Sequence, residues 1–281
     1  MAFIQAVGVV KSFGSGADTR HVLRDVSLSV ERGEFVAIVG SMGSGKSTLL
    51  SILAGLTRPD RGTVEIGGEP LEDIRRDAAF VFQNYSLLPW FTALENVRLA
   101  VQAACPDLSK AEQRDRSIRM LEQVGLGNAI NRRPRQLSGG MRQRVAIARA
   151  FATNPQVLFL DEPFGALDAL TRETLQTELA RLCSATGRPV TSVMITNNVE
   201  EAILLADRIV PMLPGPPATL GTPIPVDLPR PRTLTQLAHD EHASHVRAHV
   251  VATLTSSLGR RRSATPAPGL VGAVVLAQVK E

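Results

Sequence analysis

Cysteine, aromatic residues and long apolar runs are all scarce in this sequence of 281 residues. The two cysteines, Cys105 and Cys183, form no CxxC pair, which argues against a disulfide framework and against a cysteine zinc site. Two free thiols in a reducing compartment are the simpler interpretation. Aromatic residues make up only 4% of the chain, which disfavours binding of nucleic acid by base stacking. No stretch reaches the ~18 apolar residues that would span a bilayer, so a role at a membrane would require docking onto another protein.

The remaining composition is typical of a globular protein. Hydrophobic residues make up 44% and charged residues 21%, so bulk disorder is not expected. The formal net charge of +4 favours no particular partner. The N-terminal segment lacks the basic-then-apolar order of a signal peptide. The length suits one α/β domain with a large core, plus an appendage.

Strand and helix patterns alternate along most of the chain. Residues 34–39 form an apolar run that passes through a glycine-rich stretch into a segment of helical periodicity, which Gly55 is placed to end. Further buried strands are expected at 157–160 and 190–195, with helices between them. This alternation predicts a mostly parallel sheet with helices on both faces. Short strands are also expected within residues 1–30 and 62–83.

Changes in composition suggest how the chain is divided. We expect the α/β domain to span residues 1–213, with an inserted helical subdomain at approximately 85–145. Residues 214–281 then comprise a proline-rich connector, a C-terminal helix and a mobile tail. The connector is expected to be extended rather than packed, the helix is expected over 233–258, and the tail begins at Gly259.

A glycine-rich loop that matches GxxxxGK[ST] lies between the strand at 34–39 and the following helix. It comprises Gly40, Ser41, Met42, Gly43, Ser44, Gly45, Lys46 and Ser47, and Thr48 follows it. Glycines let successive N–H groups turn towards a phosphate chain, and the helix N-terminus adds positive potential there. We expect Lys46 to reach the β- and γ-phosphates and Ser47 to bind Mg²⁺. A purely structural turn is the less favoured interpretation.

Two adjacent acidic residues end the apolar strand at 157–160. Ligands bind at the carboxyl ends of strands in open α/β sheets. We therefore expect Asp161 to hold Mg²⁺ and Glu162 to act as general base for an attacking water. An apolar run that ends in acids is common in proteins, and the glycine-rich loop is what favours the functional interpretation here.

A second glycine motif, Ser138, Gly139 and Gly140, opens another helix. It exposes a further set of N–H groups at a helix N-terminus. Two such sites in one chain would be redundant for one nucleotide, whereas sites from two different chains would not. Taken alone, this motif is more often a flexible cap.

These motifs and their order resemble the ATP-binding cassette (ABC) transporter ATPases over roughly residues 3–213, and LSGG at 137–140 is the discriminating element. The resemblance implies a P-loop NTPase fold of class α/β, with a mostly parallel sheet core, an antiparallel β subdomain and an inserted helical subdomain. It also implies an ATPase that uses ATP and Mg²⁺. Two such subunits, identical or different, would close over the nucleotides, with Ser138 and Gly140 on the partner's ATP.

The resemblance assigns roles to further residues. Gln83 resembles the glutamine that senses Mg²⁺ and the γ-phosphate, and Asp168 would link the two sites of the pair. Phe13 resembles the aromatic residue that stacks on adenine, with a core phenylalanine as the alternative. Residues 84–91 resemble the surface that grips the membrane subunit, and Trp90 would be either an anchor there or a core residue.

One position departs from the family pattern. A histidine usually lies where this chain has Asn197, between Thr196 and Asn198. Asparagine donates a hydrogen bond but cannot carry charge or shuttle a proton. Because Glu162 is intact, we expect slower hydrolysis rather than none. Alternatively, Asn197 only caps a helix at 199–207.

Longer segments, including 82–90 and 161–169, resemble the ATPases of bacterial nitrate, nitrite and cyanate importers, with taurine and aliphatic-sulfonate importers as the alternative. This implies integral membrane permease subunits, indirectly a periplasmic or extracellular solute-binding protein, and a location at the cytoplasmic face of the membrane. The basic residues of 132–144 are interpreted as a solvated or interface cluster, so no nucleic acid is expected. A non-transport cassette protein and an ATP-binding regulator with little hydrolysis remain competing classes.

Overall fold

A computed structural model describes residues 2–184, 189–213, 215 and 217–262. Its strands are β1 (Ile4–Phe13), β2 (Arg20–Val30), β3 (Phe35–Val39), β4 (Arg61–Ile66), β5 (Glu69–Pro70), β6 (Ala78–Val81), β7 (Val157–Asp161), β8 (Thr191–Thr196), β9 (Arg208–Leu213), β10 (Thr219–Leu220) and β11 (Ile224–Pro225). Its α-helices are α1 (Lys46–Leu53), α2 (Ala93–Ala104), α3 (Lys110–Gln123), α4 (Gly139–Phe151), α5 (Ala169–Ser184), α6 (Val199–Leu205), α7 (Leu234–His239) and α8 (Glu241–Arg262). Short 3₁₀ turns lie at Gly16–Asp18, Gly127–Ala129 and Pro134–Gln136.

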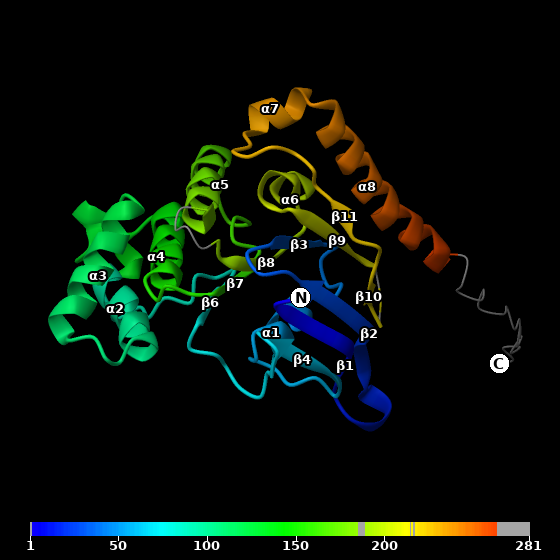
Figure 1. Ribbon diagram of the computed structural model, residues 1–281, viewed down its shortest axis with the longest axis horizontal. Coiled ribbons are helices and arrows are strands. Elements are labelled where there is room, and N and C mark those ends of the chain that lie inside the picture. The colour runs from blue at the N-terminus through cyan, green and yellow to red at the C-terminus, as the bar shows by residue number, and fades with distance from the viewer. Residues whose placement is uncertain (1, 185–188, 214, 216, 263–281) are drawn as a thin grey trace, which may run out of the picture.

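The central sheet has seven strands in the order β10-β9-β3-β8-β7-β6, with β11 also paired to β9 (Figure 1). The strands β3, β6, β7, β8 and β9 run parallel to one another. Every residue of β3 and β8 is buried, as expected for parallel strands covered on both faces. The register pairs Asp161 with Ile195 and Val39 with Thr196, so the carboxyl ends of β3, β7 and β8 meet at one edge.

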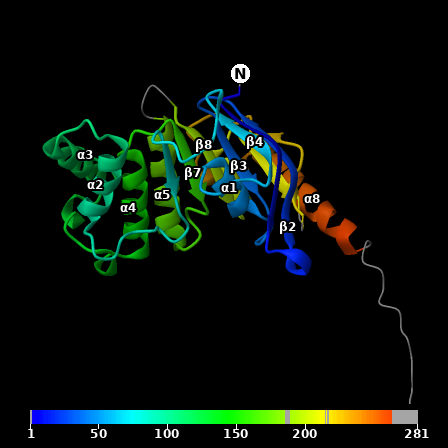
Figure 2. The ribbon, with the colours of Figure 1, turned by 90° about the horizontal axis from the view of Figure 1, so that it is seen from below.

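A second, antiparallel sheet has the order β2-β1-β4-β5 and lies beside α1 (Figure 2). Alternate residues of β3 divide the interior into two apolar clusters. Val36 and Ile38 pack with α1 and the antiparallel sheet, whereas Ala37 and Val39 pack with the helices of the opposite face. Helix α1 and the loop before it are therefore held between two sheets.

Helices α2 and α3 lie on the side of the molecule away from the antiparallel sheet, with α4 between them and α5 (Figure 2). Capping boxes begin both outer helices: Thr92 with Glu95 at α2, and Ser109 with Glu112 at α3. Helix α4 continues to Phe151 and packs against β6 and α5, so a boundary near residue 145 would cut through it.

The region after Leu213 differs from the sequence-based prediction in two ways. The proline-rich connector is packed, because β10 and β11 both pair with β9. Its prolines leave enough N–H groups for pairing, such as that of Gly221, which donates to the Pro211 carbonyl at 2.7 Å. The single helix expected over 233–258 is two helices, because Asp240 is extended and accepts a bond from the N–H of Ala243 at the start of α8. The expected mobile tail falls largely on 263–281, outside the described residues.

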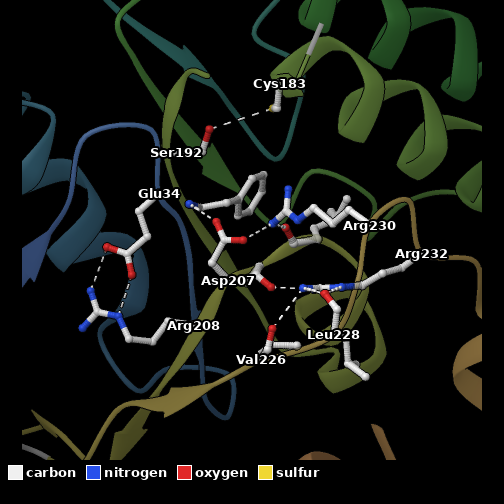
Figure 3. A network of polar contacts seen from close by, with 12 residues as sticks. Glu34, Cys183, Ser192, Asp207, Arg208, Val226, Leu228, Arg230 and Arg232 are labelled. Atoms are coloured by element: carbon white, nitrogen blue, oxygen red, sulfur yellow. Dashed lines mark hydrogen bonds and ion pairs between the residues drawn. The ribbon is translucent and has the colours of Figure 1, made fainter. Parts of the chain in front are cut away.

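Two arginines of the connector fasten it to the end of α6 (Figure 3). Arg232 donates to the carbonyls of Ile203 and Ala206 at 2.8 and 2.6 Å, and burial lowers its pKa to about 10. Arg230 donates to Asp207 Oδ1 at 2.7 Å. Carbonyl groups at a helix C-terminus lack partners within the helix and are favourable sites for a cation. The connector therefore supplies hydrogen-bond donors to the carbonyl groups at the end of α6 and stays packed against the α/β domain.

Candidate active site

The glycine-rich loop, called the phosphate loop below (residues 40–47), connects β3 to α1 as its sequence predicts. Gly45 has a left-handed backbone with φ of 94° at the start of α1. A Cβ there would lie 3.1 Å from Val22 and 3.2 Å from Leu23, so both conformation and space call for glycine. Within the loop Met42 is 82% exposed, whereas the Ser44 hydroxyl is buried and has no hydrogen-bond partner among the described residues.

Lys46 is only 4% exposed, and its ammonium group is held inside the phosphate loop. It donates to the carbonyls of Gly40 and Ser41 at 2.8 and 3.0 Å and lies 3.7 Å from Glu162 Oε1. Burial lowers the pKa of Lys46, and the charge of Glu162 opposes this effect. A buried ammonium ion is stabilised by anionic partners, and phosphate would be a further one.

The predicted acids meet Ser47 and Gln83 beside the loop. Ser47 Oγ donates to Asp161 Oδ1 at 3.3 Å, and Gln83 Nε2 donates to Glu162 Oε2 at 3.2 Å. Glu162 has a φ of 42°, and its N–H donates to the Ile195 carbonyl at 3.0 Å. Burial raises the pKa of Asp161. The ends of β6 and β7 and the start of α1 thus bring these side chains together, and the end of β8 holds the backbone of Glu162.

The chemistry of this cluster fits a magnesium nucleotide. The cluster offers a hydroxyl, two carboxylates and an amide, all with the oxygen ligands that Mg²⁺ prefers. The buried Lys46 ammonium suits phosphate oxygens, and so does the Ser44 hydroxyl, which has no hydrogen-bond partner in the part of the chain that the structure describes.

The second glycine motif lies apart from this cluster, at the start of α4. Ser138 Oγ accepts a bond from the N–H of Met141 at 3.2 Å and so caps the helix. A Cβ on Gly140 would lie 2.4 Å from Thr171 Cγ2, so close packing on α5 also requires glycine there. The nearest atoms to Gly139 belong to Tyr85, Ala166 and Leu167 rather than to the phosphate loop.

Two aromatic residues are exposed, so the core-packing alternatives for them are wrong. Phe13 is 47% exposed, with Lys11 Nζ 5.4 Å from its ring centre. Trp90 is 62% exposed and lies edge-on to Phe91, at 6.3 Å between ring centres. Both rings are accessible to a ligand or a partner.

The structure also decides what caps α6 and α5. Asn198 accepts from the N–H groups of Glu200 and Glu201 at 2.9 and 3.4 Å, whereas Asn197 is exposed at the end of β8. The capping alternative for Asn197 is therefore wrong. Asp168 Oδ1 accepts from the N–H of Thr171 at 3.0 Å, a bond that lowers the pKa of Asp168.

One feature that sequence reasoning missed is a groove of about 370 Å³ beside residues 84–91. Its lining includes Ile74, Phe82 and Arg149. Arg149 donates to the carbonyls of Tyr85 and Ser86 at 2.8 and 2.5 Å and so fixes the segment next to the groove. The position of Arg149 on an otherwise alanine-rich part of α4 was the available signal.

A strand, a glycine loop with a buried lysine, a helix and an acid at the end of the neighbouring strand define a P-loop NTPase. The family model described as ABC transporter matches residues 23–165. The chain belongs to this family, and it is an ATP-binding and ATP-hydrolysing subunit of an ABC transporter. No α-helix among the described residues has the length and apolar character needed to cross a bilayer.

Relatives and solved structures agree with this assignment. The chain is 47% identical to the nitrate import ATP-binding protein NrtD of Synechococcus elongatus, covering 86% of this chain and 88% of NrtD. It is 44% identical to the nitrate transport protein NasD of Klebsiella oxytoca, covering 88% and 94%. It is also 44% identical to the bicarbonate transport ATP-binding protein CmpC of S. elongatus, covering 89% of this chain but only 37% of CmpC. The dimeric, post-hydrolysis structure of the cassette MJ0796 with ADP and Pi matches with a TM-score of 0.72, 34% identity, 80% of this chain and 99% of that one.

The raised pKa of Asp161 makes a stability prediction. Between the pKa of Asp161 in the unfolded chain and its higher pKa in the folded protein, the folded state binds more protons than the unfolded state. The free energy of unfolding therefore falls as the pH rises through this window, and it stays lower above it. We expect Asp161→Asn to raise the unfolding temperature at neutral pH by a few degrees, about 1 kcal/mol, and to change it little near pH ~4. Calorimetry without nucleotide at both pH values measures this. A lower unfolding temperature at neutral pH would contradict it.

Proposed function

We propose that this chain powers a bacterial importer of small oxyanions of the nitrate, nitrite and cyanate type. The cluster of Lys46, Ser47, Gln83, Asp161 and Glu162 carries the hydrolytic part of the proposal. The similarity to NrtD and NasD over nearly their whole length supports the solute class.

In the proposed mechanism, the N–H groups of the phosphate loop and the Lys46 ammonium bind the β- and γ-phosphates. Ser47 and Asp161 would hold Mg²⁺, and Gln83 would orient ligands beside it. Bound Mg²⁺ supplies neutralisation of the phosphate charge. Glu162 orients the attacking water and accepts its proton. Phe13 is exposed at the end of β1, where its ring is free to stack on the adenine base.

A second cassette is needed to complete the site. Ser138, Gly139 and Gly140 present N–H groups at the start of α4, away from the phosphate loop of their own chain. We infer that they bind the γ-phosphate of the ATP held by the partner cassette. Asp168, exposed at the start of α5, would connect the two sites. The dimeric MJ0796 structures support such a pairing.

Attachment to the membrane is proposed to occur through permease subunits at the cytoplasmic face. The groove lined by Ile74, Phe82 and Arg149, with the exposed Trp90 nearby in sequence, offers an apolar docking surface. The permease and a solute-binding protein outside the membrane would select the solute, so the cassette would not contact it.

The solute is tested by uptake measurements in the source organism after deletion of the gene and complementation. Labelled nitrate, cyanate, bicarbonate and taurine are supplied separately. We expect uptake of nitrate or cyanate to be lost and to return with the intact gene but not with Glu162→Gln. Loss of taurine uptake alone would overturn the proposed solute class. If the purified chain brought no integral membrane protein with it, the transporter role would be overturned.

The exposed asparagine at the end of β8 gives a further prediction. We expect Asn197→His to raise kcat for ATP by about tenfold, ~1.4 kcal/mol, because a protonated imidazole makes a charge-assisted bond to a phosphate oxygen. Steady-state hydrolysis by the purified chain measures this, with Asn198→Asp as a control that retains the cap of α6. An unchanged rate in Asn197→His would mean that residue 197 does not act on the γ-phosphate.

A further inference from the structure

Glu201 is a buried acidic residue that has no part in the mechanism above. It lies in the first turn of α6 and is only 4% exposed. Burial raises its pKa, and the negative charge of Glu162 adds to that effect. An ionised carboxylate is costly to bury unless it is paired, so its contacts should show why the chain keeps it there.

The first contact reaches the end of β8. Thr196 Oγ1 donates to Glu201 Oε2 at 2.7 Å, and the same hydroxyl accepts from the N–H of Asn198 at 3.0 Å. The carboxylate therefore fixes the rotation of the threonine hydroxyl, and the hydroxyl fixes the peptide that follows Asn197. The backbone of Asn197 is held from both neighbouring residues.

The second contact reaches the start of α5. Arg172 Nε lies 3.8 Å from Glu201 Oε1, an ion pair rather than a hydrogen bond. Arg172 Nη2 also donates to the carbonyl of Leu167 at 3.0 Å, directly before Asp168. One side chain thus connects the segment at Asp168 with the segment at Asn197.

We propose that Glu201 is a positioning residue for ATP hydrolysis, which holds the Asn197 and Asp168 segments in one fixed arrangement through Thr196 and Arg172. The proposal rests on the proposed functions of Asn197 and Asp168. Side chains that act on reacting groups need a rigid supporting shell, and a small displacement from a distant change reduces the rate strongly.

A purely structural role is the competing explanation, because a negative charge at a helix N-terminus stabilises the helix. The neighbouring Glu200 supplies a matched control. It lies in the same turn of α6 but is more exposed and pairs with Arg247 of α8 rather than with α5. If only the helix mattered, the two glutamates would behave alike.

The experiment measures kcat, KM for ATP and thermal unfolding of the full chain for Glu201→Ala, Glu201→Gln and Glu200→Ala. We expect Glu201→Ala to lower kcat about 10- to 100-fold, with KM changed by less than about twofold. Glu201→Gln should retain more activity, because its amide oxygen still accepts from Thr196. Glu200→Ala should have the wild-type kcat.

A second measurement separates positioning from other causes. In an Asn197→Ala background, Glu201→Ala should lower kcat by less than it does in the wild type, because the two residues act as a unit. The proposal is overturned if Glu201→Ala has the wild-type kcat, or if Glu200→Ala lowers kcat as much as Glu201→Ala does. If Glu201→Ala does not fold, a wild-type kcat for Glu201→Gln overturns it and a reduced kcat supports it. Wild-type hydrolysis by Glu162→Gln would instead contradict the proposed function.

Discussion

Replacement of Glu162 by glutamine should lower ATP hydrolysis by at least about 100-fold, a loss typical of removing a general base. The amide keeps the size of the side chain and its contact with Gln83, 3.2 Å away in the wild type, but cannot accept the proton of the attacking water. Nucleotide binding should persist, because Lys46 and the loop N–H groups are untouched. Single-turnover hydrolysis and nucleotide-binding measurements on the purified chain test both parts.

The same variant tests the composite site. With ATP bound but not hydrolysed, we expect two chains to remain paired, which size-exclusion chromatography with light scattering would detect. The matched control is Glu162→Gln with Gly140→Ala, because a methyl group at 140 would collide with Thr171 of the same chain and displace the start of α4. Trapped nucleotide without pairing, or pairing without nucleotide, would contradict a site shared by two chains.

Replacement of Lys46 by methionine should abolish hydrolysis by a different route, through loss of nucleotide binding. In the wild type, Lys46 Nζ donates to the carbonyls of Gly40 and Ser41 at 2.8 and 3.0 Å. The methionine fills a similar volume but leaves both carbonyls without this donor. It also removes the charge that meets the phosphates. We expect the Kd for ATP to rise by about 100-fold, ~3 kcal/mol, as for the loss of a buried charged partner. Titration calorimetry with Glu162→Gln as reference measures this difference.

Lys46→Arg separates charge from geometry at the same position. Arginine keeps the charge, but its planar group does not fit a pocket in which the ammonium is only 4% exposed. We expect its affinity for ATP to fall nearly as far as that of Lys46→Met. If Lys46→Met bound ATP as tightly as the wild type, the phosphate loop would not be the nucleotide site.

Several features of this protein follow from short segments of sequence alone. The phosphate loop needs a strand, glycines at fixed spacing and a helix, and all of these are local. Gly45 illustrates this, since its left-handed φ belongs to the start of α1 itself. The acids at 161 and 162 follow from the end of a buried strand. Binding chemistry that depends on adjacent backbone groups can be predicted in this way.

Other expectations failed because they depended on distant segments. The proline-rich connector is packed against β9, and the helix expected over 233–258 is broken at Asp240. Composition predicts the flexibility of an isolated segment, but it does not show which strand edge lies nearby. The exposure of Phe13 is decided by the surrounding structure in the same way, whereas the cap of α6 at Asn198 is a local contact with the N–H groups of Glu200 and Glu201.

By itself, the sequence determined the phosphate loop, the acids that follow β7 and the helix start at Ser138, because each depends on neighbours within a few residues. Only the tertiary structure brought Gln83 to Glu162, and only it showed Glu201 between two loops. The contacts of Gln83 with Glu162 and of Arg172 with Glu201 depend on strand order and on the packing of α5 against α6, which join residues far apart along the chain. Local periodicity contains no information about such distances.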